Sequence, residues 1–130
     1  MSRRRAPGRL AQSDTCGPYV GAVPEIFHIT LPEHWAQAQR DGAITMSTRD
    51  VTLADEGFVH CSFAEQLAAT AARFFGDLDE VVVLRIDPEG VTSPVVAEDL
   101  SDSGELFPHV YGPIDVAAVL DARTASPLAL

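Results

Sequence analysis

The sequence contains no lysine, only two cysteines and no long apolar run, and each absence excludes a class of protein. All nine basic residues are arginines, against nineteen acidic residues, so the 130-residue chain carries a formal charge of −10. No apolar run approaches the length of a membrane-spanning helix, and we therefore expect none. Two cysteines cannot form the framework of a disulfide-stapled protein, and the lack of a Cys-x-x-Cys spacing excludes a structural zinc site of that type.

The charge is unevenly divided along the chain. Residues 1–24 hold four arginines and a single aspartate, a formal charge of +3, whereas residues 25–130 hold five arginines and eighteen acids, a formal charge of −13. An acidic body repels both a phosphate backbone and an anionic bilayer surface. We therefore expect no nucleic acid and no membrane among the partners. A small-molecule substrate is the partner that remains, and the sequence leaves the oligomeric state open.

The length suits a single domain flanked by two tails. Residues 1–23 are expected to be a mobile basic leader, because they are rich in glycine and proline and lack the apolar stretch of a secretory signal. Residues 24–123 are expected to form one α+β domain, followed by a short C-terminal tail, 124–130. With Cys16 in the leader and Cys61 in mid-chain as reduced thiols, we expect a cytoplasmic protein.

Short apolar segments predict five or six strands. Residues 26–30 alternate as a half-buried strand does, with Phe27 and Ile29 on one face. Residues 81–86 are apolar almost throughout, which predicts a strand in the middle of a sheet. Further short strands are expected at 57–61, 95–97 and 116–120. Residues 106–113 are dense in prolines and aromatics, so no ordinary strand is expected there.

Two helices are predicted, each directly after a histidine-bearing strand. Residues 30–33 (Thr-Leu-Pro-Glu) and 62–65 (Ser-Phe-Ala-Glu) both have the order of a capping box. The first helix is expected to end near Arg40, and Gly76 is expected to end the second in a left-handed conformation. Residues 46–56 are expected to be irregular. One apolar stripe on the second helix should contain Leu67, Ala71, Phe74 and Phe75.

Three of the four histidines occur in segments that suggest a site. His28 and His60 each precede a predicted helix N-terminus, where unpaired amides can hold an anion or a polarised oxygen. His109 lies in the segment 106–113, and His34 is expected on a helix surface. Because two strand–histidine–helix elements share one design, we expect a common cleft lined by imidazoles, which titrate near neutral pH.

A metal site and a cysteine nucleophile are two weaker alternatives. The available metal ligands are the three histidines with Glu98, Asp99 or Glu105. They lack a diagnostic spacing, and we expect no bound metal. Cys61 points away from His60 if the strand is extended, so it would need His28 or His109 as its base.

Three motifs resemble a known family. They are Phe27-His28-Ile29-Thr30, residues 56–62 (Glu-Gly-Phe-Val-His-Cys-Ser) followed by Ala64-Glu65-Gln66, and residues 104–113 (Gly-Glu-Leu-Phe-Pro-His-Val-Tyr-Gly-Pro). Together they look like the bacterial family of unknown function numbered nine-five-two, over residues 26 to about 122. That family is similar in fold to the ADP-ribosyltransferases, in which small split β-sheets hold NAD. The resemblance thus implies this fold, with two main helices and long crossing loops, and NAD as a candidate cofactor.

The same resemblance implies roles for particular residues. RNA 2′-phosphotransferases of that superfamily carry His-Gly-Thr on the first strand and a histidine strand ending in serine, which residues 28–30 and 60–62 resemble. The first histidine there holds the ribose hydroxyl, and fixed dipoles stabilise charge that develops on the ribose. Ile29 stands where the pattern has glycine, and no catalytic glutamate is plainly in place. The acidic body argues against the RNA-processing branch.

The leading hypothesis is a small-molecule enzyme, either NAD-related or recruited to another reaction such as a cyclisation or an elimination. Its predicted catalytic residues are His28, His60 and His109, with His60 or His109 as general acid/base. The predicted ligand-binding residues are Thr30, Ser62, Glu105, Phe107 and Tyr111. The alternative is a non-catalytic module that binds a small molecule or a protein. The two hypotheses differ in whether the three imidazoles must face one cavity.

Overall fold

The computed structural model describes residues 24–130, so the predicted leader, with Cys16, lies outside the described residues. Within them the chain is α+β, as predicted, and forms small antiparallel sheets. The first sheet has the order β1-β4-β8, with β1 at Ile26–Thr30, β4 at Val81–Ile86 and β8 at Val119–Ala125. The second has the order β3-β6-β5, with β3 at Val59–His60, β6 at Phe107–Val110 and β5 at Val95–Glu98. A two-stranded ribbon pairs β2, Ala43–Ile44, with β7, Ile114–Asp115.

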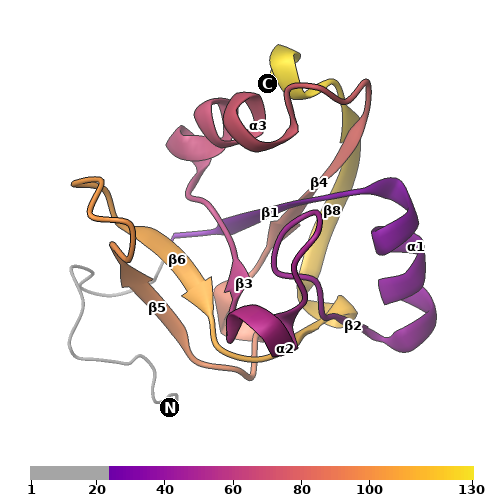
Figure 1. The fold of residues 1–130 in the computed structure, drawn as a ribbon. Coiled ribbons are helices and arrows are strands. Elements are labelled where there is room, and N and C mark those ends of the chain that lie inside the picture. Colours follow the sequence, from indigo (N-terminus) through magenta and orange to yellow (C-terminus); the bar gives the residue numbers. More distant parts are fainter. Residues whose placement is uncertain (1–23) are drawn as a thin grey trace.

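Helix α3, Leu67–Phe75, covers one face of the first sheet, while α1, Pro32–Asp41, and the short α2, Leu53–Glu56, lie on its other side (Figure 1). The central strand β4 contributes to both cores. Val81 and Val83 pack with α3, whereas Leu84 and Ile86 pack into the larger core between the first sheet and the rest of the domain. Burial on both faces explains why this strand is apolar at every position except Arg85, as expected for a strand in the middle of a sheet.

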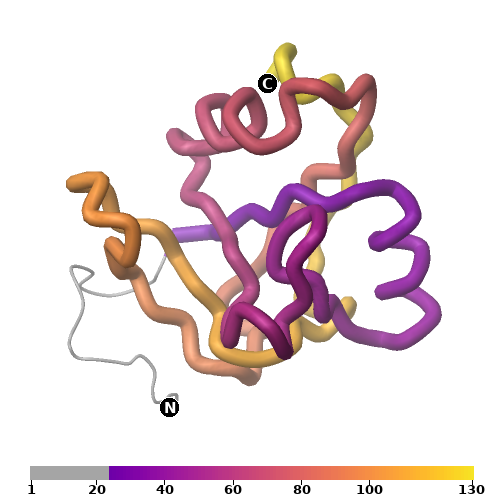
Figure 2. The backbone as a smooth tube through the Cα atoms, viewed as in Figure 1, coloured from indigo at the N-terminus to yellow at the C-terminus, as the bar shows by residue number. Residues whose placement is uncertain are grey.

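Residues 59–62 pass from one sheet to the other (Figure 2). His60 is paired with His109 of β6 in the second sheet. Two residues later, Ser62 is paired with Phe27 of β1 through two backbone hydrogen bonds, of 2.7 and 2.8 Å. This short segment therefore joins the two sheets, and its side chains lie at their junction.

Residues 107–110 form a strand in the middle of the second sheet, so the prediction of no ordinary strand there was wrong. Proline is tolerated because the neighbouring strand ends beside it. The carbonyl of Pro108 accepts a hydrogen bond from the amide of Cys61, 3.0 Å away, but Pro108 has no N–H to return. Strand β3 accordingly ends at His60.

Both predicted capping boxes are absent. Thr30 is the last residue of β1, and Leu31 occupies the cap position of α1 without a side-chain hydrogen bond. Ser62 belongs to the sheet junction rather than to a helix cap. The amide of Phe63 instead donates to the side-chain oxygen of Gln66, 2.9 Å away, at the start of a 3-10 helix that leads into α3. Tertiary pairing thus takes both hydroxyl residues away from their local role.

The end of α3 differs from its prediction in two respects. Phe74 is 47% exposed and does not belong to the buried stripe, which consists of Leu67, Ala71 and Phe75. Gly76 has a φ of −62°, so it does not end the helix in a left-handed conformation. A side chain is excluded there for another reason, because a Cβ at Gly76 would lie 2.5 Å from the carbonyl oxygen of Ala72.

Residues 46–56, which were expected to be irregular, and the predicted C-terminal tail, 124–130, both contain regular structure. Residues 46–56 contain an isolated bridge from Met46 to Thr52, and the Thr52 hydroxyl accepts from the amide of Asp55 at the start of α2. The predicted C-terminal tail continues β8 to residue 125 and then forms a 3-10 helix against α3, in which Pro127 is buried. No helix within residues 24–130 is long and apolar enough to cross a membrane.

Candidate functional site

The backbone of His60 is fixed on the side that faces away from β6. Its amide donates to the carbonyl oxygen of Ser47, 3.3 Å away, and its carbonyl oxygen lies 2.8 Å from Nδ1 of His28. A carbonyl only accepts, so Nδ1 of His28 carries a proton and donates it. The imidazole of His28 thereby satisfies a polar group that a strand edge leaves unpaired.

His28 supports the site rather than facing its opening. His28 is only 2% exposed, and this burial lowers the pKa of its imidazole from 6.5 to about 4. The ring is therefore neutral at physiological pH, in the tautomer that the carbonyl of His60 requires. Its position on β1 makes it the link between the first sheet and the strand that carries His60.

His60 projects among aromatic rings while remaining partly exposed. Its ring centroid lies 5.3 Å from that of His109, 5.4 Å from that of Phe107 and 6.3 Å from that of Phe74. Burial lowers the pKa of His60 to about 4, and the neighbouring His109 and His28 contribute smaller shifts in the same direction. At physiological pH this imidazole is uncharged, with a nitrogen lone pair available to accept a proton or a hydrogen bond.

His109 lies behind His60 and is buried. Its Nδ1 is 2.9 Å from a carboxylate oxygen of Glu98, and the same oxygen accepts a hydrogen bond from the hydroxyl of Tyr111. The ring of His109 stacks on Phe58 with centroids 4.1 Å apart. Burial and the bond to Glu98 raise the pKa of Tyr111, so its hydroxyl stays protonated. Glu98 and Phe58 together fix the orientation of the His109 ring.

A small pocket of about 50 Å³ opens beside His60. No lining residue carries a formal charge once His60 is neutral; they are Ile29, Ser47, Thr48, His60, Ser62, Thr70, Phe74 and Phe75. The hydroxyl of Ser62 donates to that of Thr70, 3.3 Å away. Ser47 is only 1% exposed, and its buried hydroxyl has no hydrogen-bond partner among the described residues. An unpaired buried hydroxyl is costly, which marks it as a group available to a ligand.

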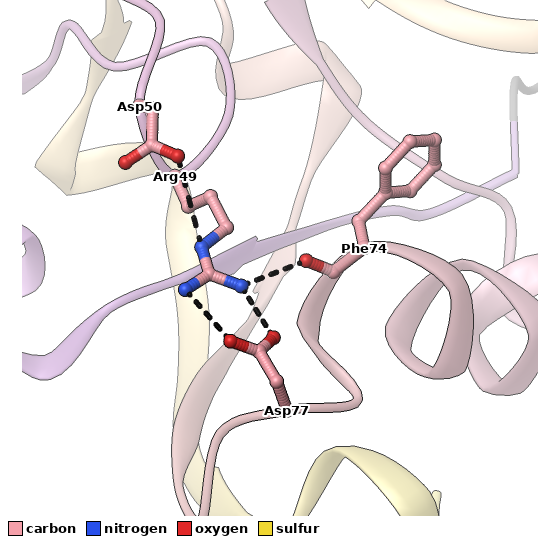
Figure 3. Close-up of polar contacts among 4 residues, drawn as sticks. All are labelled: Arg49, Asp50, Phe74 and Asp77. Carbon is pink, nitrogen blue, oxygen red and sulfur yellow. Dashed lines mark hydrogen bonds and ion pairs between the residues drawn. The ribbon is translucent and has the colours of Figure 1, made fainter.

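Arg49 connects the two walls of this pocket (Figure 3). One wall is the loop that carries Ser47 and Thr48, and the other is the end of α3. The Arg49 guanidinium makes two hydrogen bonds to the Asp77 carboxylate, of 2.7 and 3.3 Å, and a third of 3.1 Å to the carbonyl oxygen of Phe74. These hydrogen bonds from Arg49 lower the pKa of Asp77. The planar guanidinium thus sets the spacing of the walls.

Replacing Arg49 by lysine is expected to loosen the loop wall. A lysine ammonium cannot make the paired contact with Asp77 while also reaching the Phe74 carbonyl in the same geometry. Amide hydrogen exchange at Ser47 and Thr48 should become faster in the Arg49→Lys variant. Arg40→Lys is the matched control, because Arg40 donates a hydrogen bond to Gln37 on the surface of α1, away from the pocket. Unchanged exchange in the loop would show that Arg49 does not hold it.

The structure brings the three predicted catalytic histidines together but does not turn them toward one cavity. Of the three, only His60 lines the pocket. His28 contacts the backbone of His60, and His109 packs against its ring. The prediction of a cleft lined by all three imidazoles is therefore wrong, because one imidazole lies at the pocket and two buried ones support it. An enzyme in which all three imidazoles act on the substrate is excluded, and an enzyme hypothesis now depends on His60 alone.

The predicted ligand-binding residues are divided among several locations. Ser62 lines the pocket, and the ring of Phe107 lies beside that of His60. Tyr111 is 39% exposed with its hydroxyl on Glu98. Glu105 is an exposed residue whose carboxylate accepts from the Gln66 amide at 3.4 Å.

Thr30 lies at a second hollow, between α1 and β2, with a volume of about 110 Å³. His34 lines this hollow too and is half-buried, so it is not the solvated helix-surface residue that was predicted. Thr30 therefore does not share a pocket with His60.

Six pocket residues, and the supporting residue Glu98, were not among the predicted site residues. The pocket residues are Ile29, Ser47, Thr48, Thr70, Phe74 and Phe75. Nothing local distinguishes Ser47, because the loop is brought to His60 by tertiary contacts. Glu98 had been considered only as a metal ligand. An alternating pattern across a β5–β6 pair places positions 98 and 109 on one face, a signal that was lost when 106–113 was not assigned to a strand.

Neither the metal site nor the cysteine nucleophile is supported by residues 24–130. Among residues 24–130, no group of three or more histidine, cysteine, aspartate or glutamate side chains is placed to hold a metal ion. Cys61 is buried in the larger core, and burial raises the pKa of its thiol. A buried protonated thiol is a poor nucleophile, so Cys61 acts as a packing residue.

The sequence and the fold both have relatives. The family described as protein of unknown function (DUF952) matches residues 29–122. The crystal structure of protein CC0527 from Caulobacter crescentus is 34% identical, with a TM-score of 0.62, over 78% of this chain and 84% of that chain. The solution NMR structure of CC0527 is 32% identical, with a TM-score of 0.53, over 78% of this chain and 83% of that one. No curated protein matches significantly. The chain therefore belongs to the DUF952 family of proteins of unknown function.

Proposed function

We propose that this protein is a small-molecule enzyme in which the neutral imidazole of His60 acts as general acid/base on a compact group held in the adjoining pocket. The observation that supports this proposal most directly is the composition of the pocket. It contains one partly exposed imidazole and the unpartnered hydroxyl of Ser47, and no charged residue. An uncharged imidazole beside a free hydroxyl can accept a proton from a bound group and return it.

The neighbouring residues would position His60 rather than react. The hydrogen bond from His28 fixes the backbone of His60, and Glu98 holds His109 against the His60 ring. The hydroxyl of Ser47 would bind the polar end of the substrate group. Phe74 and Phe75 line the same pocket, and their apolar rings would limit the access of water to it.

The size of the pocket limits the substrate group. A cavity needs a volume of about 10–15 Å³ to hold one water molecule. The pocket, at about 50 Å³, therefore holds a group no larger than one carboxamide or the edge of a small ring. A whole dinucleotide does not fit inside it. For NAD, the candidate cofactor, we propose that only the nicotinamide end enters and that the remainder lies along the surface.

An ADP-ribosyltransferase-like fold belongs to the same proposal. Two small antiparallel sheets joined by residues 59–62 support it. His28 does not, because it is buried and bonded to the backbone of His60 and so cannot hold a ribose hydroxyl in the pocket. The acidic body, with a formal charge of −13 over residues 25–130, favours a small-molecule substrate over nucleic acid.

The test uses NAD⁺ and free nicotinamide as probes. We expect saturable heat on titration with NAD⁺ at millimolar concentration and slow release of nicotinamide, measured by chromatography. His60→Gln should reduce the release by at least about 10²-fold, the usual contribution of a general acid/base. His34→Gln is the matched control, because His34 lines the separate hollow beside α1. It should leave both readouts unchanged.

The outcomes separate the possibilities. No heat with either probe would remove the NAD-related version. Heat without nicotinamide release, unaffected by His60→Gln, would instead support the non-catalytic binding module. That second candidate is favoured by one observation, the low pKa of His60, because an imidazole with a pKa of about 4 is a weak base and a good hydrogen-bond acceptor.

A further inference from the structure

The outer edge of β8 has no partner within the described chain. β8 is seven residues long and pairs with β4 along one edge only. Residues 120–124 are all exposed, including Leu120 at 48%. A long strand edge presents a row of unpaired amides and carbonyls, which another strand can pair with.

Two charged side chains on this strand also lack partners among the described residues. Asp121 and Arg123 make no hydrogen bond or ion pair with any residue from 24 to 130. The other four arginines of this part of the chain all have contacts: Arg40 with Gln37, Arg49 with Asp77, Arg73 with the ring of Phe74, and Arg85 with Glu25. In a body with eighteen acidic residues, Arg123 is thus an exposed cation with which a carboxylate of a second copy can pair.

The order Asp121-Ala122-Arg123 is complementary to itself in an antiparallel pair. If a two-fold axis passes beside Ala122, Asp121 of one copy lies directly opposite Arg123 of the other, and the arrangement repeats on the second side. Opposite charges at directly opposed positions stabilise a strand pair. Such an interface is isologous, so it closes as a dimer.

We propose that β8 pairs with β8 of a second copy of this chain about an axis at Ala122. The two first sheets then form one continuous sheet with the order β1-β4-β8-β8-β4-β1. None of the residues that line the pocket beside His60 belongs to β8, so the pocket stays open in the dimer. The interface is therefore independent of the proposed function.

Reversing the charges at Asp121 and Arg123 tests the proposal. The dissociation constant of the dimer is measured by sedimentation at increasing protein concentration. Asp121→Arg places two arginines opposite each other on both sides of the axis, and Arg123→Asp does the same with two aspartates. Each single variant should weaken the dimer about tenfold or more. The double variant D121R/R123D restores opposite charges at both positions, so its dissociation constant should return to within a few fold of that of the unaltered chain.

The controls carry the same charge changes elsewhere on the surface. Asp79→Arg and Arg40→Asp should leave the association unchanged. Ala122→Cys, in a chain whose Cys16 is replaced by serine, should form a disulfide between copies on mild oxidation, because opposed residues in a strand pair have suitably spaced Cα atoms. A chain that stays monomeric at millimolar concentration would overturn the proposal, and so would a double variant that associates no better than the single ones.

Discussion

Acidification from pH 6.5 to about 4 is expected to destabilise the folded protein strongly, because two imidazoles at the sheet junction resist protonation. The pKa values of His28 and His60 are both lowered from 6.5 to about 4, mainly by burial. Below pH 6.5 the unfolded chain therefore binds protons that the folded chain does not. The free energy of unfolding falls through this window and has its full value above it. One imidazole shifted this far corresponds to about 3 kcal/mol.

Urea unfolding between pH 7 and pH 4 measures this effect, and two amide variants of His28 isolate its share. Asparagine places an amide nitrogen near the position of Nδ1, so His28→Asn keeps a donor for the carbonyl of His60 without a titrating group. Its stability should depend less on pH than that of the unaltered protein.

Glutamine places its amide nitrogen farther from the backbone, so His28→Gln should lose the hydrogen bond and be less stable than His28→Asn at every pH. The carboxylates titrate in all of these proteins and therefore cancel in the comparison. If His28→Asn retained the full pH dependence, His28 would not be the source.

Strands were predicted correctly where the sequence pattern that indicates them lies within the strand itself. Residues 81–86 are apolar because both faces of β4 are covered, and that pattern is readable without knowing what covers them. The strand at Phe107–Val110 was missed because its proline is acceptable only where the neighbouring strand ends. That condition depends on Cys61, more than forty residues away in the chain.

The same distinction applies to the site. His60 and Ser62 were predicted because a histidine and a serine between a strand and a helix form a recognisable local pattern. The position of Ser47 was not predictable, since tertiary contacts bring its loop to the pocket: the hydrogen bond from the amide of His60 and those from Arg49 to the end of α3. The capping prediction for Ser62 failed for a related reason. Its backbone pairs with Phe27, and its hydroxyl with Thr70.

Ser47→Ala and Ser62→Ala are expected to change stability in opposite directions. Both serines are buried and line the same pocket, but only the hydroxyl of Ser62 has a partner. Removing the unpartnered hydroxyl of Ser47 relieves a desolvation cost, which should stabilise the protein by about 1 kcal/mol. Removing that of Ser62 leaves Thr70 without its donor and should destabilise the protein by a similar amount, about 1 kcal/mol. Urea unfolding at pH 7 compares the two variants directly.

A gain in stability at Ser47 has a functional meaning. A buried hydroxyl that destabilises the ligand-free protein is retained where a ligand supplies its hydrogen bond, since strain of this kind concentrates at functional sites. Ser47→Ala should therefore bind NAD⁺ or nicotinamide more weakly than the unaltered chain while unfolding at a higher urea concentration. If Ser47→Ala were as destabilising as Ser62→Ala, its hydroxyl would be satisfied within the protein. The pocket would then lose the unpaired buried hydroxyl on which the proposed recognition of a substrate beside His60 depends.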